Sequence, residues 1–175
     1  MENEQKPNSK IALNYGILLG AASILVSVTL YALGMQYDQD WKQGTFGILV
    51  MIIVIFLGIK KYKELNGGFL TVGEAIKTGV GIALIGSIIS LLYSFIFMNY
   101  IEPDFITNIS AKAEQNMLEN YPELTDEQIE QALSMTKKMT SPAIMTSIGL
   151  ITSLIFGLII SSITGFILKK NKEQY

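Results

Sequence analysis

The fold is decided around Asn66-Gly67-Gly68-Phe69-Leu70-Thr71-Val72-Gly73-Glu74, the stretch that leads into an apolar segment at residues 74–98. No charged residue occurs from position 78 to position 101. Because an α-helix rises about 1.5 Å per residue, about 20 apolar residues are enough to cross a hydrocarbon core of ~30 Å. We therefore predict a membrane-spanning helix here, the third of four in the chain.

The start of this helix carries a local signal of its own. Thr71 and Glu74 have the S/T-x-x-E spacing of a capping box, and Gly67-Gly68 before them indicates a turn. Glu74 and Lys77 lie three residues apart, close enough to pair on the first helical turn. Glu74 could be a proton or ion ligand at the membrane edge. A cap and an interfacial ion pair explain it more simply, because it lies at the mouth of the helix and not at mid-membrane.

Composition predicts a membrane protein for the whole chain. Half of the residues are hydrophobic and only 16% are charged. The other uncharged stretches are residues 11–37, 43–59 and 139–168. A cleaved signal peptide is the alternative for the first stretch, but the stretch is longer than the usual apolar core of such a peptide and further spans follow. The predicted fold is all-α, an integral membrane four-helix bundle.

The predicted organisation has five parts. Residues 1–10 form an N-terminal tail, residues 11–100 hold spans one to three, residues 142–168 form span four, and residues 169–175 form a second tail. Residues 101–141 are the one long polar stretch, in which acidic residues outnumber lysines. They are predicted to form a helical hairpin, because Thr125 and Gln128 show a second capping box and Pro122 separates two stripes of helical period. The stripes are expected to bury against each other, the outer membrane face or a partner, and they consist of Phe105, Ile109, Ala113, Met117 and Tyr121, and then Ile129, Ala132, Leu133, Met135 and Met139. Ser141 before Pro142 indicates the start of span four.

Lysine placement predicts the orientation, since positively charged loops stay in the cytoplasm. The chain has 13 basic residues, all lysine. Nine of them fall on the side of the N-terminus, the second loop and the C-terminus: Lys6, Lys10, Lys60, Lys61, Lys63, Lys77, Lys169, Lys170 and Lys172. We expect a bacterial inner (cytoplasmic) membrane protein with both termini cytoplasmic and the acidic hairpin extracytoplasmic.

Small residues at spacing four predict how the spans pack. Span four carries such a ridge: Gly149, Ser153, Gly157, Ser161 and Gly165. In lipid, close approach of helices through small residues matters more than hydrophobic gain. The ridge is expected to pack inside the bundle, and the alternative is a homodimer seam along span four. The lipid bilayer is the one partner that the sequence requires.

Catalytic and metal chemistry have little support in the sequence. There is no Cys, His or Arg, which removes thiolate ligands, the commonest general base and bidentate phosphate recognition. The net charge of −2 argues against nucleic acid as a partner. Asp38 and Asp40 could bind a cation, but a solvated turn is the simpler interpretation. We assign no catalytic, cofactor-binding or metal-binding residue.

Methionine thioethers leave one further metal alternative open. Met117, Met135, Met139 and Met145 could offer soft ligands to Cu(I) on the extracytoplasmic side. Packing of an apolar stripe explains these residues more simply.

Two stretches carry a resemblance to a known family. They are Gly67-Gly68-Phe69-Leu70-Thr71-Val72-Gly73-Glu74-Ala75-Ile76-Lys77 and Thr125-Asp126-Glu127-Gln128-Ile129-Glu130-Gln131. With the four-span layout, they resemble a bacterial family of small membrane proteins known as a domain of unknown function, over roughly residues 10–170. The resemblance implies a bacterial inner membrane and no known activity.

The functional expectation follows from the hairpin. We expect a non-enzymatic structural or interaction protein that presents the acidic hairpin outside, with a membrane protein partner contacted through residues 101–141. The alternative is a subunit of a small channel or transporter, suggested by the Ser-rich faces of spans three and four. No span carries a charged residue at its centre, as ion-coupled transport usually requires.

Overall fold

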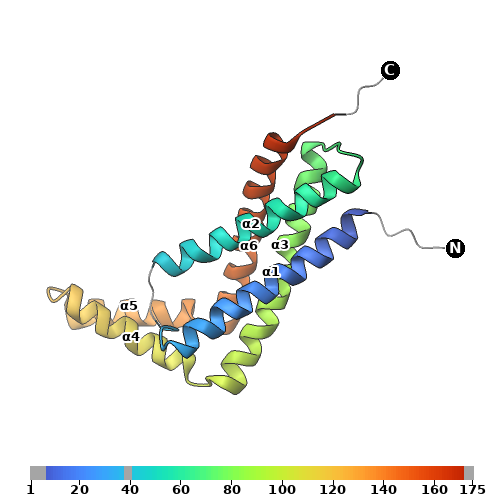
Figure 1. The fold of residues 1–175 in the computed structure, drawn as a ribbon. Helices are drawn as coiled ribbons and strands as arrows, with labels where there is room; N and C mark the ends of the chain where they lie inside the picture. The colour runs from blue at the N-terminus through green and yellow to red at the C-terminus, as the bar shows by residue number, and fades with distance from the viewer. Residues whose placement is uncertain (1–6, 38–40, 172–175) are drawn as a thin grey trace.

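The computed structural model describes residues 7–37 and 41–171, and its regular elements within these ranges are all helical (Figure 1). The helices are α1 (Pro7–Ala32), α2 (Trp41–Leu65), α3 (Val72–Ile96), the π-helix η1 (Phe97–Ile101), α4 (Phe105–Asn120), α5 (Asp126–Met139) and α6 (Pro142–Leu168). The all-α prediction is therefore confirmed.

Four helical stretches are long and apolar enough to cross a membrane. They are Asn8–Ala32, Gln43–Leu65, Val72–Ile101 and Pro142–Leu168. The structure thus has the four membrane-capable helices that the sequence predicts, as a membrane protein requires. The uncharged stretch of the second span ends at position 59, and in the structure its helix continues past Lys60, Lys61 and Lys63 to Leu65.

The four spans run alternately up and down. Figure 1 shows the start of α1, the α2–α3 connection and the end of α6 at one end of the bundle, which we call the terminal end. The helices α4 and α5 leave from the opposite end, which we call the hairpin end. At the terminal end, Leu70 and Lys170 exchange backbone hydrogen bonds of 2.9 Å, and Lys63 donates to the carbonyl of Leu168 at 2.8 Å. The loop before α3 is thus fixed to the end of α6.

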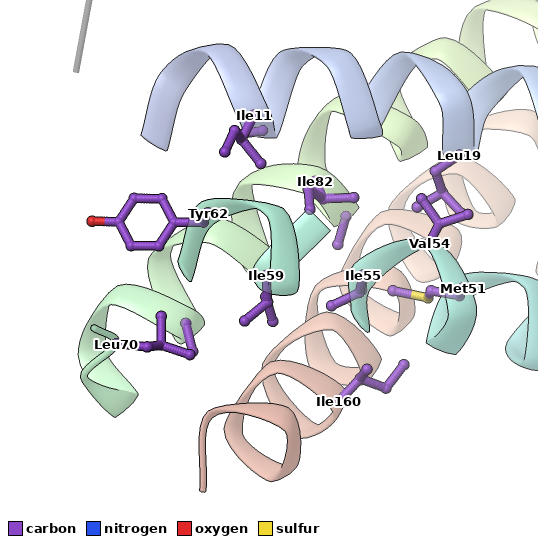
Figure 2. Close-up of a cluster of buried hydrophobic side chains, with 13 residues drawn as sticks. Ile11, Leu19, Met51, Val54, Ile55, Ile59, Tyr62, Leu70, Ile82 and Ile160 are labelled. Atoms are coloured by element: carbon purple, nitrogen blue, oxygen red, sulfur yellow. The ribbon is translucent and has the colours of Figure 1, made fainter. Parts of the chain in front are cut away.

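The core of the bundle lies toward the terminal end. Its largest fully buried side chains are Ile55, Ile59, Leu70, Ile82, Thr78 and Ser161. Figure 2 shows Ile55 and Ile59 of α2 between Ile82 of α3 and Ile160 of α6. Helix α3 contacts all three other spans, so the segment from which the prediction started is the central helix of the bundle.

Glycines bring the central helix close to its neighbours. A Cβ on Gly157 of α6 would lie 2.6 Å from the Ala83 Cβ of α3, and one on Gly79 of α3 would collide with the Ser161 side chain. On the other face of α3, a Cβ on Gly16 of α1 would lie 2.5 Å from the Ile85 Cβ. The ridge of small residues on α6 therefore packs against α3 of the same chain in this half of the bundle.

The predicted capping boxes are both present. Thr71 and Glu74 cap α3 reciprocally, and Thr125 and Gln128 do the same for α5. Ser141 is the N-cap position of α6, as predicted, but its side chain makes no capping hydrogen bond. Pro142 at the first helical position fixes the backbone there, so the helix starts without a side-chain acceptor.

Helices α4 and α5 lie beside each other and are joined by residues 121–125 (Figure 1). Neither helix has a fully buried residue. The half-buried positions of α5 are Ile129, Ala132, Leu133 and Thr136, which share one helical face. Three of the predicted stripe residues, Tyr121, Met135 and Met139, are exposed, and Tyr121 lies just past the end of α4. Because the stripes could also be buried against the membrane face or a partner, their packing stays a prediction.

Candidate functional site

The hairpin end of the bundle contains a cavity between the four spans. Its volume is about 360 Å³, which lies near the lower limit of small-molecule sites, about 300–1,000 Å³. All four spans contribute to its wall. The lining residues are Leu19, Ser23, Gly47, Met51, Gly86, Ser87, Ser90, Leu91, Ser94, Phe95, Met98, Asn99, Pro142, Met145, Thr146, Gly149 and Ser153.

The cavity exists because α2 and α6 each pack along only one half of their length. The fully buried residues of α6 begin at Gly157, and those of α2 begin at Met51. A Cβ built on Gly47 or Gly149 would meet no atom within 4 Å. The first halves of α2 and α6 therefore leave space that the other two spans do not fill.

Hydroxyl groups make the cavity wall weakly polar. Ser23, Ser90 and Ser94 donate to carbonyls of their own helices at 2.9–3.0 Å. Ser87 does the same at 2.8 Å, and Ser153 reaches the Ala83 carbonyl of α3 at 3.5 Å. Because the hydroxyl protons are used in these hydrogen bonds, the serine oxygens can offer only acceptor lone pairs to the cavity. No lining residue in the described part of the chain is charged. The wall can accommodate a neutral group, and it lacks a group suited to acid–base chemistry.

The methionines considered as Cu(I) ligands lie in two separate places. Met145 lines the cavity with Met51 and Met98, whereas Met135 and Met139 lie exposed on α5. The two aspartates considered for a cation, Asp38 and Asp40, fall outside the described residues. Within residues 7–37 and 41–171, no group of three or more His, Cys, Asp or Glu side chains could hold a metal ion.

Glu74 acts as the cap that its spacing predicts. Its carboxylate accepts hydrogen bonds from the Thr71 backbone N–H and hydroxyl, both at 2.8 Å, and from the Tyr62 hydroxyl at 3.1 Å. One turn later, the fully buried Thr78 donates to the Asn8 side chain at 2.8 Å. These contacts tie α1 and α2 to α3 at the terminal end. The pairing of Glu74 with Lys77 stays a prediction.

A second polar cluster at the hairpin end was not predicted. The Tyr37 hydroxyl donates to Glu102 at 2.6 Å, and Asn108 donates to the Tyr37 oxygen at 2.9 Å. Burial, and then the Glu102 carboxylate, raise the pKa of Tyr37 above its ordinary value of 10.0. The Phe105 ring stacks on Tyr37 and meets Phe97 edge-on. The cluster joins Tyr37, which follows α1, to the start of α4. Since Tyr37 and Glu102 are far apart in the chain, no local spacing in the sequence pointed to it.

Comparison with known proteins gives a family and no function. Neither curated proteins nor solved structures provide a match. Residues 14–170 match a family described as Protein of unknown function (DUF4199), which agrees with the resemblance that the α3 start and the α5 start carried. Because this match covers most of the sequence, the chain belongs to the DUF4199 family.

Proposed function

We propose that this protein is a non-enzymatic interaction protein of the bacterial inner membrane, with both ends of the chain cytoplasmic and α4–α5 outside. The observation that carries the proposal is the surface of α4–α5. Leu118, Tyr121, Met135 and Met139 are all more than half exposed there, among acidic side chains. Large exposed apolar side chains rimmed by charges are typical of protein–protein contact sites. A partner with a mixed apolar and basic surface would fit them.

The arrangement of the spans supports the orientation. The terminal end gathers the start of α1, the α2–α3 connection and the end of α6, and these segments hold most of the lysines. The hairpin end carries the excess of acidic residues. One side of the bundle therefore gathers most of the lysines, as the positive-inside tendency expects of a cytoplasmic face.

The orientation can be tested without removing native cysteines, since the chain has none. Glu130→Cys on α5 and Glu64→Cys at the end of α2 give one thiol on each side. In spheroplasts, a membrane-impermeant maleimide should label the first variant at once and the second only after lysis. Labelling of Glu64→Cys in intact spheroplasts, with Glu130→Cys protected, would show that the protein has the opposite orientation.

The interaction can be tested by photo-crosslinking in intact cells. A photoreactive residue at Met135 should give a discrete protein adduct, because this side chain is 66% exposed on α5. The same residue at Phe166, equally exposed on the spanning part of α6, is the control and should give lipid adducts. Identical adduct patterns at the two positions would contradict a contact through α4–α5.

A channel or transporter subunit is the second candidate, and the cavity is the observation in its favour. The cavity ends inside the bundle, however. Toward the terminal end, Ile55, Ile59 and Ile82 are fully buried against one another (Figure 2). A blind cavity suits binding better than conduction. Ser161→Cys provides the test, since Ser161 lies in this closed part. Rapid reaction with a water-soluble thiol reagent would favour the transporter, and slow reaction would favour the interaction protein.

A further inference from the structure

We propose that the cavity at the hairpin end binds one hydrocarbon chain of a membrane lipid, which enters from the bilayer between α2 and α6. This site is separate from the α4–α5 surface, and it would exist with either orientation of the protein. Four observations carry the inference: where the cavity opens, what lines it, how large it is, and where polar groups stand around it.

The opening faces lipid. Gly47 and Gly149 lie on the two helices that separate, and a side chain at either position would meet empty space. The neighbouring side chains of the same helices are apolar and exposed on the spanning surface: Phe46, Leu49, Ile148 and Ile151. A molecule that reaches the cavity between these residues comes from the hydrocarbon region, where acyl and isoprenoid chains are the abundant species.

The lining suits a chain that cannot hydrogen-bond. The serine hydroxyls donate to backbone carbonyls, so an occupant is offered few donors. Met51, Met98 and Met145 supply flexible thioether side chains, which adapt to irregular apolar shapes. A charged or sugar-like occupant would lose its hydration without replacement hydrogen bonds, at a cost of several kcal/mol.

The size limits the occupant to one chain. A water molecule takes ~30 Å³ of liquid volume, and a methylene group is of similar size, so about 360 Å³ holds about a dozen such units. The floor is closed by Leu19, which packs against Gly86. A complete two-chain lipid would not fit, so its remaining chain and its headgroup must stay outside.

Polar groups stand where the headgroup would emerge. Asn99, in η1, is exposed at the hairpin end of the cavity and uses one amide N–H on the Phe95 carbonyl at 2.8 Å. Its second N–H and its carbonyl are suited to an ester or hydroxyl group. Thr146 on α6 also lines this end. A polar group at one end and a closed apolar floor at the other orient a single chain along the bundle.

The experiment uses the full chain in vesicles of phosphatidylglycerol and phosphatidylethanolamine that contain a phospholipid with a diazirine in one acyl chain. After irradiation, adducts are located by peptide mass spectrometry. In the wild type we expect enrichment in the peptide that holds Ser90 and Leu91. Gly47→Leu and Gly149→Leu should each lower that labelling by about fivefold or more, because a cavity near the lower size limit loses the volume of a leucine side chain.

Gly44→Leu is the matched control. Gly44 lies on α2 one turn before Gly47, its Cβ would also meet nothing, and it does not line the cavity. Labelling should stay at the wild-type level in this variant. Because a Cβ at any of the three positions would meet no atom within 4 Å, all three proteins should fold, and their thermal unfolding provides the check.

Three outcomes would overturn the inference. The first is labelling spread evenly over exposed spanning residues such as Leu25 and Phe166, with no dependence on the glycine variants. The second is rapid reaction of Ser90→Cys with a water-soluble thiol reagent in unlabelled vesicles, which would show a water-filled cavity. The third is a crosslink between two copies of the chain from the same lining residues, which would make a second copy the occupant.

Discussion

The two halves of the bundle use the same residue types for opposite purposes. In the terminal half, Gly79 and Gly157 let α3 and α6 approach until a single added methyl group would collide. In the hairpin half, Gly47 and Gly149 border empty space, and an added Cβ would meet no atom within 4 Å. On α2 and α6, a glycine therefore marks close packing in the terminal half and an unfilled wall in the hairpin half.

The difference follows from the physics of helix association in lipid. Apolar side chains gain little by leaving lipid for protein, so tight packing and hydrogen bonds hold spanning helices together. The terminal half has both, with small residues on α3 and α6 and polar contacts around Glu74 and Thr78. The hairpin half lacks this packing between α2 and α6. We infer that stability resides in the terminal half and that binding is possible in the other.

The largest expected effect comes from filling a contact in the terminal half. Gly157→Leu should lower the free energy of unfolding by about 2–3 kcal/mol, because the new side chain must displace Ala83 of α3. Thermal unfolding in mild detergent, followed by circular dichroism, measures the loss. Gly149→Leu lies two turns earlier on the same helix and is the control, with an expected change near zero. Equal losses in the two variants would remove the distinction between the halves.

A smaller effect is expected from the two capping boxes, one in each region. Thr71→Ala should lower the stability of the whole bundle by about 1 kcal/mol, because α3 contacts every other span. Thr125→Ala removes an equivalent cap from α5, which has no fully buried residue. Its effect should be confined to faster amide exchange in α5. Loss of global stability in the Thr125 variant would show that α4–α5 supports the bundle.

The sequence predicted those features of the two halves that depend on residues close together in the chain. Uncharged stretches predicted four spans, and the spacings Thr71–Glu74 and Thr125–Gln128 predicted both caps. The cavity could not be predicted. Gly149 continues the same spacing as Gly157 and Gly165, yet only the latter two meet a closely packed neighbour. Which part of the ridge meets α3 depends on where helices cross, and no local pattern encodes a crossing point.

The polar cluster at Tyr37 shows the same limit. Each residue has an ordinary local interpretation: Tyr37 suits a membrane boundary, and Glu102 belongs to an acidic stretch. Their 2.6 Å hydrogen bond depends on η1 turning the chain so that α4 starts beside the end of α1. Met135 and Met139 of the predicted α5 stripe are exposed within the chain. What covers them would lie outside the chain, and no helical period identifies it.

The smallest expected effect tests whether the hairpin end is coupled to the bundle at all. The pKa of Tyr37 is raised in the folded state by burial and by Glu102, so the neutral phenol is the form that folding favours. Its stabilising contribution is complete below the unfolded value of 10.0 and is lost as the pH rises through the higher folded pKa. A spectrophotometric titration of tyrosinate, wild type minus Tyr37→Phe, should show one group that ionises above pH 10. Over the same range the start of α4 should become sensitive to protease while the thermal unfolding of the spans stays unchanged.

If instead the difference titration centres at or below 10, the Tyr37–Glu102 hydrogen bond does not form in solution. If the spans lose stability together with α4, the two regions form one cooperative unit, and the open half contributes to the stability of the closed one.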